Sequence, residues 1–191
     1  MPERHYEVEK VKMIDVDSLV LEKEDISFLE LRVRFINELK KSNFSKELFV
    51  EICHWKSHRN AKHPLKNAQE KITRVMSNVF KNGVVQPEAI EKLSELDGVR
   101  TPTASVFLTL YDPDKYGVVD YHAWQSLHVR GLLHYNSSGQ GLKPSDYNNY
   151  LNNIRLLAIE YNVSPRIIDI SLMAENQRRN PNHKSLCWLG T

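Results

Sequence analysis

Apolar side chains recur every three or four residues along most of this 191-residue chain, and we find no convincing run in which apolar and polar residues alternate. The clearest case is a run in which Ile72, Val75, Met76, Val79 and Phe80 share one helical face. This spacing fits the turn of an α-helix, whereas a half-buried strand would place apolar residues at every second position. Gly and Pro are also scarce, at 7 and 8 residues, which favours helices over turn-rich β structure. The sequence therefore predicts an all-α fold.

The same periodicity, bounded by capping and helix-breaking residues, predicts about eight helices within a single compact domain over residues 1–191. The predicted helices cover residues 25–41, 45–55, 71–81, 87–96, 101–111, 120–128, 147–161 and 165–173, and residues 180–191 form an irregular tail. In the first helix, Asp25 is the expected N-cap residue. The side chains expected to face the core in that helix are Ile26, Leu29, Val33, Ile36 and Leu39.

The composition excludes several kinds of site and location. Two cysteines, Cys53 and Cys187, are too few for an iron–sulfur cluster held by this chain or for a framework of disulfides. The spacing of Cys53, His54, His58 and His63 matches no zinc-binding pattern, so we expect no metal site and no cofactor. The charged N-terminal segment and the lack of an apolar run of about 18 residues favour neither secretion nor a membrane partner. We expect a cytoplasmic protein, associated with the nucleoid if the source is a bacterium.

Basic residues are concentrated in one segment of a chain whose net charge is only +2. Residues 56–81 carry seven basic side chains against one acidic side chain, Glu70, whereas residues 1–50 carry a net charge of −2. The basic side chains are Lys56, Arg59, Lys62, Lys66, Lys71, Arg74 and Lys81. This pattern predicts a surface that faces phosphate groups, including a helix face formed by Lys71, Arg74 and Lys81. The alternative is an ordinary solvated loop and helix face.

A helix, a tight turn and a second helix are predicted at the centre of the chain. Asp97 and Gly98 end the first helix, and Thr101 is the expected N-cap residue of the second, with Pro102 in its first turn. The N–H groups at the start of the second helix lack intrahelical acceptors and lie at the positive end of the helix dipole. A phosphate group is therefore expected to bind at this turn. The residues expected to contact it are Gly98, Val99, Arg100 and Thr101.

The residues of this turn and of the segment that follows it form a longer pattern. An apolar residue, a glycine, an apolar residue and a small residue cross the turn at Leu96, Gly98, Val99 and Ala104. Asp120 lies 22 residues after Gly98, directly follows two valines, and is followed two residues later by His122. Over residues 96–124 the chain resembles the helix-hairpin-helix core of the DNA glycosylase superfamily, which includes endonuclease III and 8-oxoguanine DNA glycosylase. The position of His122, two residues after Asp120, is particularly similar to the pattern of the 8-oxoguanine branch.

The resemblance implies a protein that binds duplex DNA, flips a damaged or modified nucleotide out of the helix and hydrolyses the N-glycosidic bond of its base. Asp120 stands where the family places its essential aspartate. The expected role of Asp120 is to stabilise positive charge that develops on the sugar and to position a water molecule. The candidates for the substrate pocket come from two segments, and they are Trp55, Lys56, Arg59, Tyr121, His122 and Trp124.

Two positions depart from the family pattern. Arg100 stands where many members have the second glycine of the hairpin, and Pro102 stands where bifunctional members have a nucleophilic lysine. A proline cannot form a Schiff base. The resemblance therefore implies either a monofunctional glycosylase, which lacks efficient strand cleavage, or a relative that has lost the chemistry.

Two other functions are compatible with the same residues. One is a non-catalytic DNA-binding relative that keeps the hairpin. The other is a helical protein-interaction module, in which Asp120 only caps a helix and the basic segment contacts an acidic partner. The surroundings of Asp120 distinguish these functions. An open pocket beside the hairpin favours chemistry, a filled core favours binding alone, and a position remote from the hairpin favours the interaction module.

Overall fold

Helices account for all the regular secondary structure in the part of the chain that the structure describes. The computed structural model describes residues 18–41, 43–57, 62–80 and 88–181. Its helices are α1 (Ile26–Leu39), α2 (Lys46–Lys56), the 3-10 turn η2 (Pro64–Lys66), α3 (Gln69–Val79), α4 (Ala89–Leu93), α5 (Thr101–Tyr111), α6 (Tyr121–Val129), α7 (Pro144–Tyr161) and α8 (Pro165–Arg179). The prediction of an all-α fold is therefore confirmed. Most of the predicted tail lies outside the described residues.

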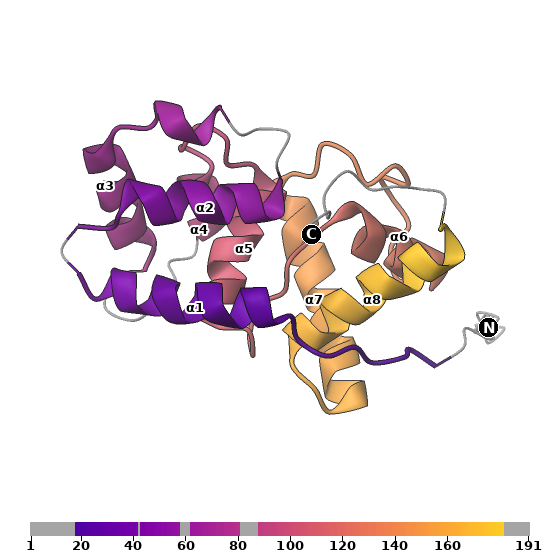
Figure 1. Ribbon diagram of the computed structural model, residues 1–191. Helices are drawn as coiled ribbons and strands as arrows, with labels where there is room; N and C mark the ends of the chain where they lie inside the picture. The colour runs from indigo at the N-terminus through magenta and orange to yellow at the C-terminus, as the bar shows by residue number, and fades with distance from the viewer. Residues whose placement is uncertain (1–17, 42, 58–61, 81–87, 182–191) are drawn as a thin grey trace, which may run out of the picture.

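Helices α1–α5 form one half of the molecule and α6–α8 form the other (Figure 1). In the first half α1, α2 and α4 pack against α5, and in the second α6 and α7 pack against α8. Residues 18–25 run alongside the second half before they enter α1. In this segment the backbone N–H of Leu19 donates to the Tyr161 hydroxyl, and that of Glu22 donates to the Ser171 hydroxyl, both at 2.9 Å. Together with the contact between α5 and α7, these bonds join the two halves into one compact domain.

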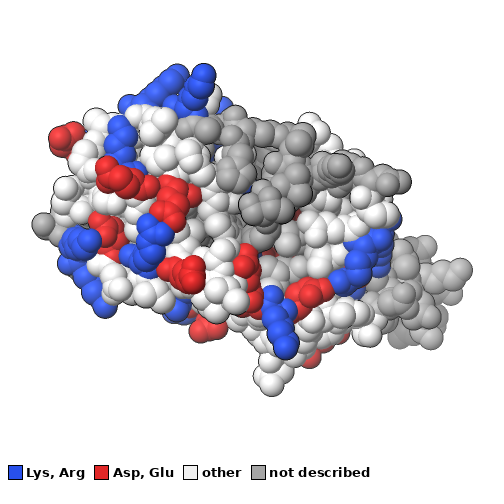
Figure 2. Space-filling view, in the orientation of Figure 1, with Lys and Arg blue, Asp and Glu red and all other residues white. Residues whose placement is uncertain are grey.

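The outer face of α1 and α2 carries charges of both signs. Figure 2 shows acidic and basic side chains mixed over this face. Arg34 of α1 forms a two-bond ion pair with Glu51 of α2, and about half of each side chain is exposed. Exposed pairs of this kind contribute less than about 1 kcal/mol, so the packing of α1 on α2 depends mainly on its apolar face.

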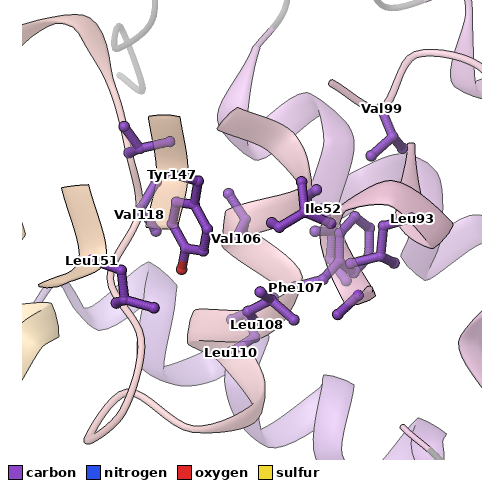
Figure 3. Packing of buried hydrophobic residues seen from close by; sticks show 14 of the residues in the cluster. Ile52, Leu93, Val99, Val106, Phe107, Leu108, Leu110, Val118, Tyr147 and Leu151 are labelled. Carbon is purple, nitrogen blue, oxygen red and sulfur yellow. The ribbon is translucent and has the colours of Figure 1, made fainter. Parts of the chain in front are cut away.

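α5 lies at the centre of the hydrophobic core. Ile52 of α2 lies on the side of α5 from which the Phe107 side chain projects, whereas Val118 and Tyr147 lie on the opposite side (Figure 3). Phe107 is fully buried, and its ring stacks on that of Phe49 with centroids 5.8 Å apart. Since α5 is covered on both sides, nine of its eleven residues are buried. Truncation of a ring such as Phe107 to alanine costs about 3–5 kcal/mol of stability.

The face that α1 turns to the core agrees only in part with the prediction. Its buried residues are Phe28, Leu31, Phe35 and Glu38. Of the five residues predicted to face inward, Ile36 and Leu39 are half-buried and pack against the core, whereas Ile26, Leu29 and Val33 are exposed. Both faces of this helix carry apolar residues, so their spacing did not distinguish the two. The phenylalanine face is the inward one because aromatic rings bury more apolar area and can pack edge to face. The ring of Phe35 does so with Phe44 and Phe80, at centroid distances of 5.7 and 5.5 Å.

Side-chain caps fix the beginning of several helices. Asp25 accepts a hydrogen bond from the N–H of Ser27 at 2.9 Å, which confirms the predicted cap of α1. Ser164 accepts a bond from the N–H of Ile167 at 3.3 Å, and Pro165 follows it at the first position of α8. These local signals are the reason that most helix starts agree with the sequence analysis.

Candidate functional site

The turn between α4 and α5, which we call the hairpin turn, has the backbone shape that the sequence pattern requires. Gly98 has a φ of +83°, in the left-handed region that glycine adopts without steric cost. A Cβ at this position would also lie 2.6 Å from Cδ of Pro64 in η2, closer than unbonded carbon atoms can approach. Leu96 and Val99, on either side of the glycine, are buried. Glycine is therefore needed at position 98 both for the turn and for the close approach of η2.

The side chain of Asn67 fixes the hairpin turn from outside the hairpin. Its amide oxygen accepts a bond from the N–H of Asp97 at 2.9 Å, and its amide nitrogen donates to the carbonyl oxygen of Asp97 at 2.9 Å. The same nitrogen donates to the carbonyl oxygen of Pro64 at 3.0 Å. Asn67 is buried, and its loss would remove the side-chain partner of both backbone groups of Asp97. The sequence analysis missed Asn67 because a bond across 30 residues leaves no local pattern.

The predicted N-cap residue of α5 is wrong by one position. Arg100 is the N-cap residue and Thr101 is the first helical residue, with no side-chain hydrogen bond capping the helix. A pocket of about 310 Å³ adjoins the hairpin turn and is lined by His63 and residues 94–100. A second pocket of about 610 Å³ lies against Arg100, Thr101 and Lys143. An anion at this end of α5 would meet the N–H groups of Thr101 and Thr103, since Pro102 has none, and the exposed side chain of Arg100.

The backbone that leads into Asp120 is held by α5 and α8. The N–H of Val119 donates to the hydroxyl of Ser105 in α5 at 3.1 Å. The N–H of Val118 donates to Oδ2 of Asp169 in α8 at 2.7 Å. Both bonds are buried, so solvent does not compete for them. They fix the position of Asp120 relative to the second helix of the hairpin.

Two tyrosines of α7 hold the same backbone from a third direction. The hydroxyl of Tyr147 donates to the carbonyl oxygen of Gly117, and that of Tyr150 donates to the carbonyl oxygen of Val118, both at 3.1 Å. Burial raises the pKa of both phenols above the usual range, which keeps them in the neutral, donating form. The segment before Asp120 is therefore bound on both edges by side chains from three helices.

Asp120 is the N-cap residue of α6, and its two carboxylate oxygens have different partners. Oδ1 accepts a hydrogen bond from the N–H of Ala123 at 2.7 Å, which confirms the expected cap. Oδ2 lies 3.9 Å from Nζ of Lys56. The side chains of Lys56 and Asp120 are only 5% and 11% exposed. The cap thus uses one oxygen, and the other faces a buried ammonium group.

Lys56 is the last residue of α2 and lies on its inward face. It follows Ile52 and Cys53 by four and three residues, and both are buried, so the helix turns Lys56 in the same direction. The sequence analysis included Lys56 both among the basic side chains expected to face phosphate groups and among the candidates for the substrate pocket. The structure corrects the first expectation: Lys56 is a buried partner of Asp120. Its position on the apolar stripe of α2 was the signal that could have identified it.

A second buried ion pair lies next to this site. Nη1 of Arg166 donates to Oδ1 of Asp169 at 2.7 Å, and Nε of Arg166 donates to Glu24 at 2.9 Å. Burial raises the pKa of Asp169 to about 7, although the attraction of Arg166 and the bond from Val118 act in the opposite direction. Asp169 thus connects the charge of Arg166 to the backbone that positions Asp120.

Two of the candidate pocket residues on α6 are packed into the protein interior. Trp124 is fully buried in the core, where its ring stacks with that of Tyr150 at a centroid distance of 6.4 Å. His122 is 2% exposed, and its Nδ1 lies 2.7 Å from Nδ2 of Asn176 in α8. A nucleotide could contact these side chains only after a rearrangement of the site.

The remaining pocket candidates have different surroundings. Trp55 is half-buried and packs on Phe28 of α1, and its indole N–H donates to the hydroxyl of Ser27 at 3.2 Å. It therefore closes the core next to α1. Tyr121 is half-buried in the first turn of α6. Arg59 lies outside the described residues.

Part of the basic segment forms an exposed cationic surface. Lys62, Lys66 and Arg74 are exposed, and Lys71 is half-buried on the same outward side of α3 as Arg74. We refer to Lys71 and Arg74 as the α3 basic face. The third residue expected on this face, Lys81, lies outside the described residues. Basic side chains also gather at the upper edge of the molecule in Figure 2.

The described residues contain no group of three or more His, Cys, Asp and Glu side chains that could hold a metal ion. Among these residues, no helix is long and apolar enough to cross a membrane. Comparison of the chain with protein-family models, with curated proteins and with solved structures found no match.

Proposed function

We propose that this protein is a DNA glycosylase-like enzyme that binds duplex DNA through the hairpin turn, takes up a flipped damaged or modified nucleotide and hydrolyses the N-glycosidic bond of its base. The proposal rests on one observation above all. Asp120 is a carboxylate held beside the second helix of the hairpin, with one oxygen bound as a helix cap and the other facing Lys56.

The Lys56–Asp120 pair is difficult to explain as a device for stability. Removal of both charges from water costs several kcal/mol per ion, and only close, hydrogen-bonded geometry repays that cost. The distance of 3.9 Å exceeds the range of a charge-assisted hydrogen bond. A buried ion pair with this geometry is therefore weak evidence for a stabilising role, and a chemical role for Asp120 accounts for its position equally well.

Asp120 is suited to stabilise a developing sugar cation. Cleavage of an N-glycosidic bond leaves positive charge at C1′ and O4′, and a fixed carboxylate nearby lowers the energy of that state. The carboxylate has its full effect only if it does not have to move during the reaction. The preceding backbone supplies that rigidity, because it donates hydrogen bonds to Ser105 and Asp169 and accepts them from Tyr147 and Tyr150.

The hairpin turn and the α3 basic face are suited to bind the DNA backbone. Contacts from backbone N–H groups and exposed cations to phosphates anchor a duplex without reading its sequence. An enzyme that searches for rare lesions among normal bases needs binding of this kind. Duplex DNA is therefore the proposed partner, and no cofactor is needed for the proposed reaction.

A non-catalytic DNA-binding relative is the second candidate, and the burial of Asp120 favours it. The residue is 9% exposed, so the site must open before a nucleotide reaches it. The interaction-module alternative required Asp120 to lie far from the hairpin. It lies next to α5 instead, since Val119 is bonded to Ser105.

A cleavage screen tests the proposed function. Duplexes that each carry one modified base are incubated with excess protein, and hot alkali then converts abasic sites into strand breaks that a denaturing gel resolves. Excision of at least one base supports the proposal. Normal DNA binding with no excision across a broad panel refutes it and supports the non-catalytic relative.

A further inference from the structure

We infer that Lys56 supplies a reactive amine: its Nζ forms a covalent imine with the sugar of the excised nucleotide, and base removal is followed by cleavage of the strand. This inference rests on the proposed function and assigns Lys56 a role in it. It differs from the expectation drawn from Pro102, which leaves the hairpin without an amine. The structure brings an amine to the same carboxylate from another helix.

The geometry places the amine of Lys56 where the reaction would occur. If Asp120 stabilises charge at C1′, the sugar must lie within a few ångströms of Oδ2. Nζ of Lys56 is 3.9 Å from that oxygen. Lys56 is also the one buried lysine among those that the structure describes, and the others are exposed or half-buried. A lysine confined beside the reacting atom has a much higher effective concentration than a surface lysine.

The proposed steps balance without an oxidant or reductant. The ammonium group of Lys56 gives a proton to the departing base, and its lone pair forms the C1′–Nζ bond as the C1′–base bond breaks. Asp120 then takes a proton from Nζ. The C1′–O4′ bond opens, O4′ gains a proton, and a C1′=Nζ iminium forms. Loss of a proton from C2′ expels the 3′-phosphate, and water finally hydrolyses the imine and releases Lys56.

A purely structural role for Lys56 makes a different prediction. In that role Lys56 only compensates the charge of Asp120, and arginine would substitute for it, because a guanidinium also carries a positive charge. Arginine cannot form the imine. The Lys56→Arg variant therefore separates the two roles. Lys40, an exposed lysine at the end of α1 and outside the basic segment, provides a matched Lys40→Arg control.

The experiment uses a duplex with a single abasic site, so it does not require knowledge of the base that the enzyme removes. Full-length protein and the duplex are mixed with sodium cyanoborohydride, which reduces an imine to a stable secondary amine. A denaturing gel measures the covalent adduct, and mass spectrometry of the digested adduct identifies the modified lysine. We expect a wild-type adduct on Lys56, a loss of about tenfold or more in Lys56→Arg, and little change in Lys40→Arg.

Three results overturn the inference. The first is that the wild-type protein binds the duplex but forms no adduct with it. The second is that the adduct forms on an amine other than Lys56, and the third is that Lys56→Arg forms as much adduct as the wild-type protein. The mapped adduct of the wild-type protein decides the question even if Lys56→Arg does not fold. The outcomes also separate this inference from the proposed function. Base excision without an adduct refutes only the role of Lys56, whereas an adduct on Lys56 without excision of any base refutes only base removal.

Discussion

Replacement of Asp120 by asparagine tests the proposed mechanism most directly. Asparagine has nearly the same shape and can accept the hydrogen bond from Ala123, so the cap of α6 is retained. It carries no charge and cannot stabilise a sugar cation in the same way. Loss of one preorganised electrostatic group raises a reaction barrier by about 3 kcal/mol, so single-turnover excision should fall about a hundredfold.

The structure also sets the expected cost of Asp120→Asn in stability. The substitution leaves the buried ammonium of Lys56 without its carboxylate. Loss of one partner from a well-formed buried ion pair costs about 3–5 kcal/mol. At 3.9 Å the Lys56–Asp120 pair is not hydrogen-bonded, so we expect a smaller loss of about 2 kcal/mol. A domain of ordinary stability, about 5–15 kcal/mol, remains folded after such a loss.

The assay compares three proteins on one excised lesion, with enzyme in excess and alkali treatment at each time point. Asp25→Asn is the matched control, because Asp25 also caps a helix, accepting the N–H of Ser27 at 2.9 Å, but lies on α1 and is half-buried. Asp120→Asn should bind the duplex with unchanged affinity and excise slowly, and Asp25→Asn should excise at the wild-type rate. Excision by Asp120→Asn at the wild-type rate would show that Asp120 is only a cap and would refute the mechanism.

Three other measurements test the DNA surface, the hairpin turn and buried Asp169. DNA affinity should fall about a hundredfold or more between 50 and 200 mM salt if about six phosphates are contacted, and salt-independent binding would contradict phosphate contacts. Alanine substitutions on the α3 basic face should weaken binding to all DNA sequences alike. Gly98→Ala should lower the free energy of unfolding by at least about 2 kcal/mol in an unfolding titration. The control Gly141→Ala should lower it by about 1 kcal/mol, because φ is +61° there but nothing lies near the added Cβ. Equal losses would contradict the contact between Gly98 and η2. Because burial raises the pKa of Asp169 to about 7, between pH 4 and 7 the folded state holds a proton that the unfolded chain has lost. Its contribution to the free energy of unfolding therefore falls as pH rises through that range, by at most about 1.4 kcal/mol per unit, and Asp169→Asn should lack this slope.

Local patterns predicted the elements whose signals lie within a few neighbouring residues. The apolar stripe of α3 and the caps at Asp25 and Asp120 are confirmed, because side chains three or four residues apart determine them. The turn at Gly98 is confirmed for the same reason. The inward face of α1 was predicted only in part, since two apolar faces compete there and only the partner helices select between them.

Contacts across long stretches of sequence had no local signal. Asn67 reaches Asp97 across 30 residues, and Asp169 reaches Val118 across 51 residues. Each is a single polar side chain that pairs with a backbone group. Side-chain identity alone does not show which backbone group a buried asparagine or aspartate will bind. The rigid support of the site could therefore be recognised only in the folded chain.

Lys56 lies between these two cases. Its place on the stripe of Ile52 and Cys53 indicated burial, while the surrounding positive charge suggested the surface. A lysine is almost never buried without a partner. A lysine on the buried stripe of α2 therefore requires a carboxylate close to it in the folded protein. The structure shows that this carboxylate is Asp120, the residue that the pattern around the hairpin also indicates.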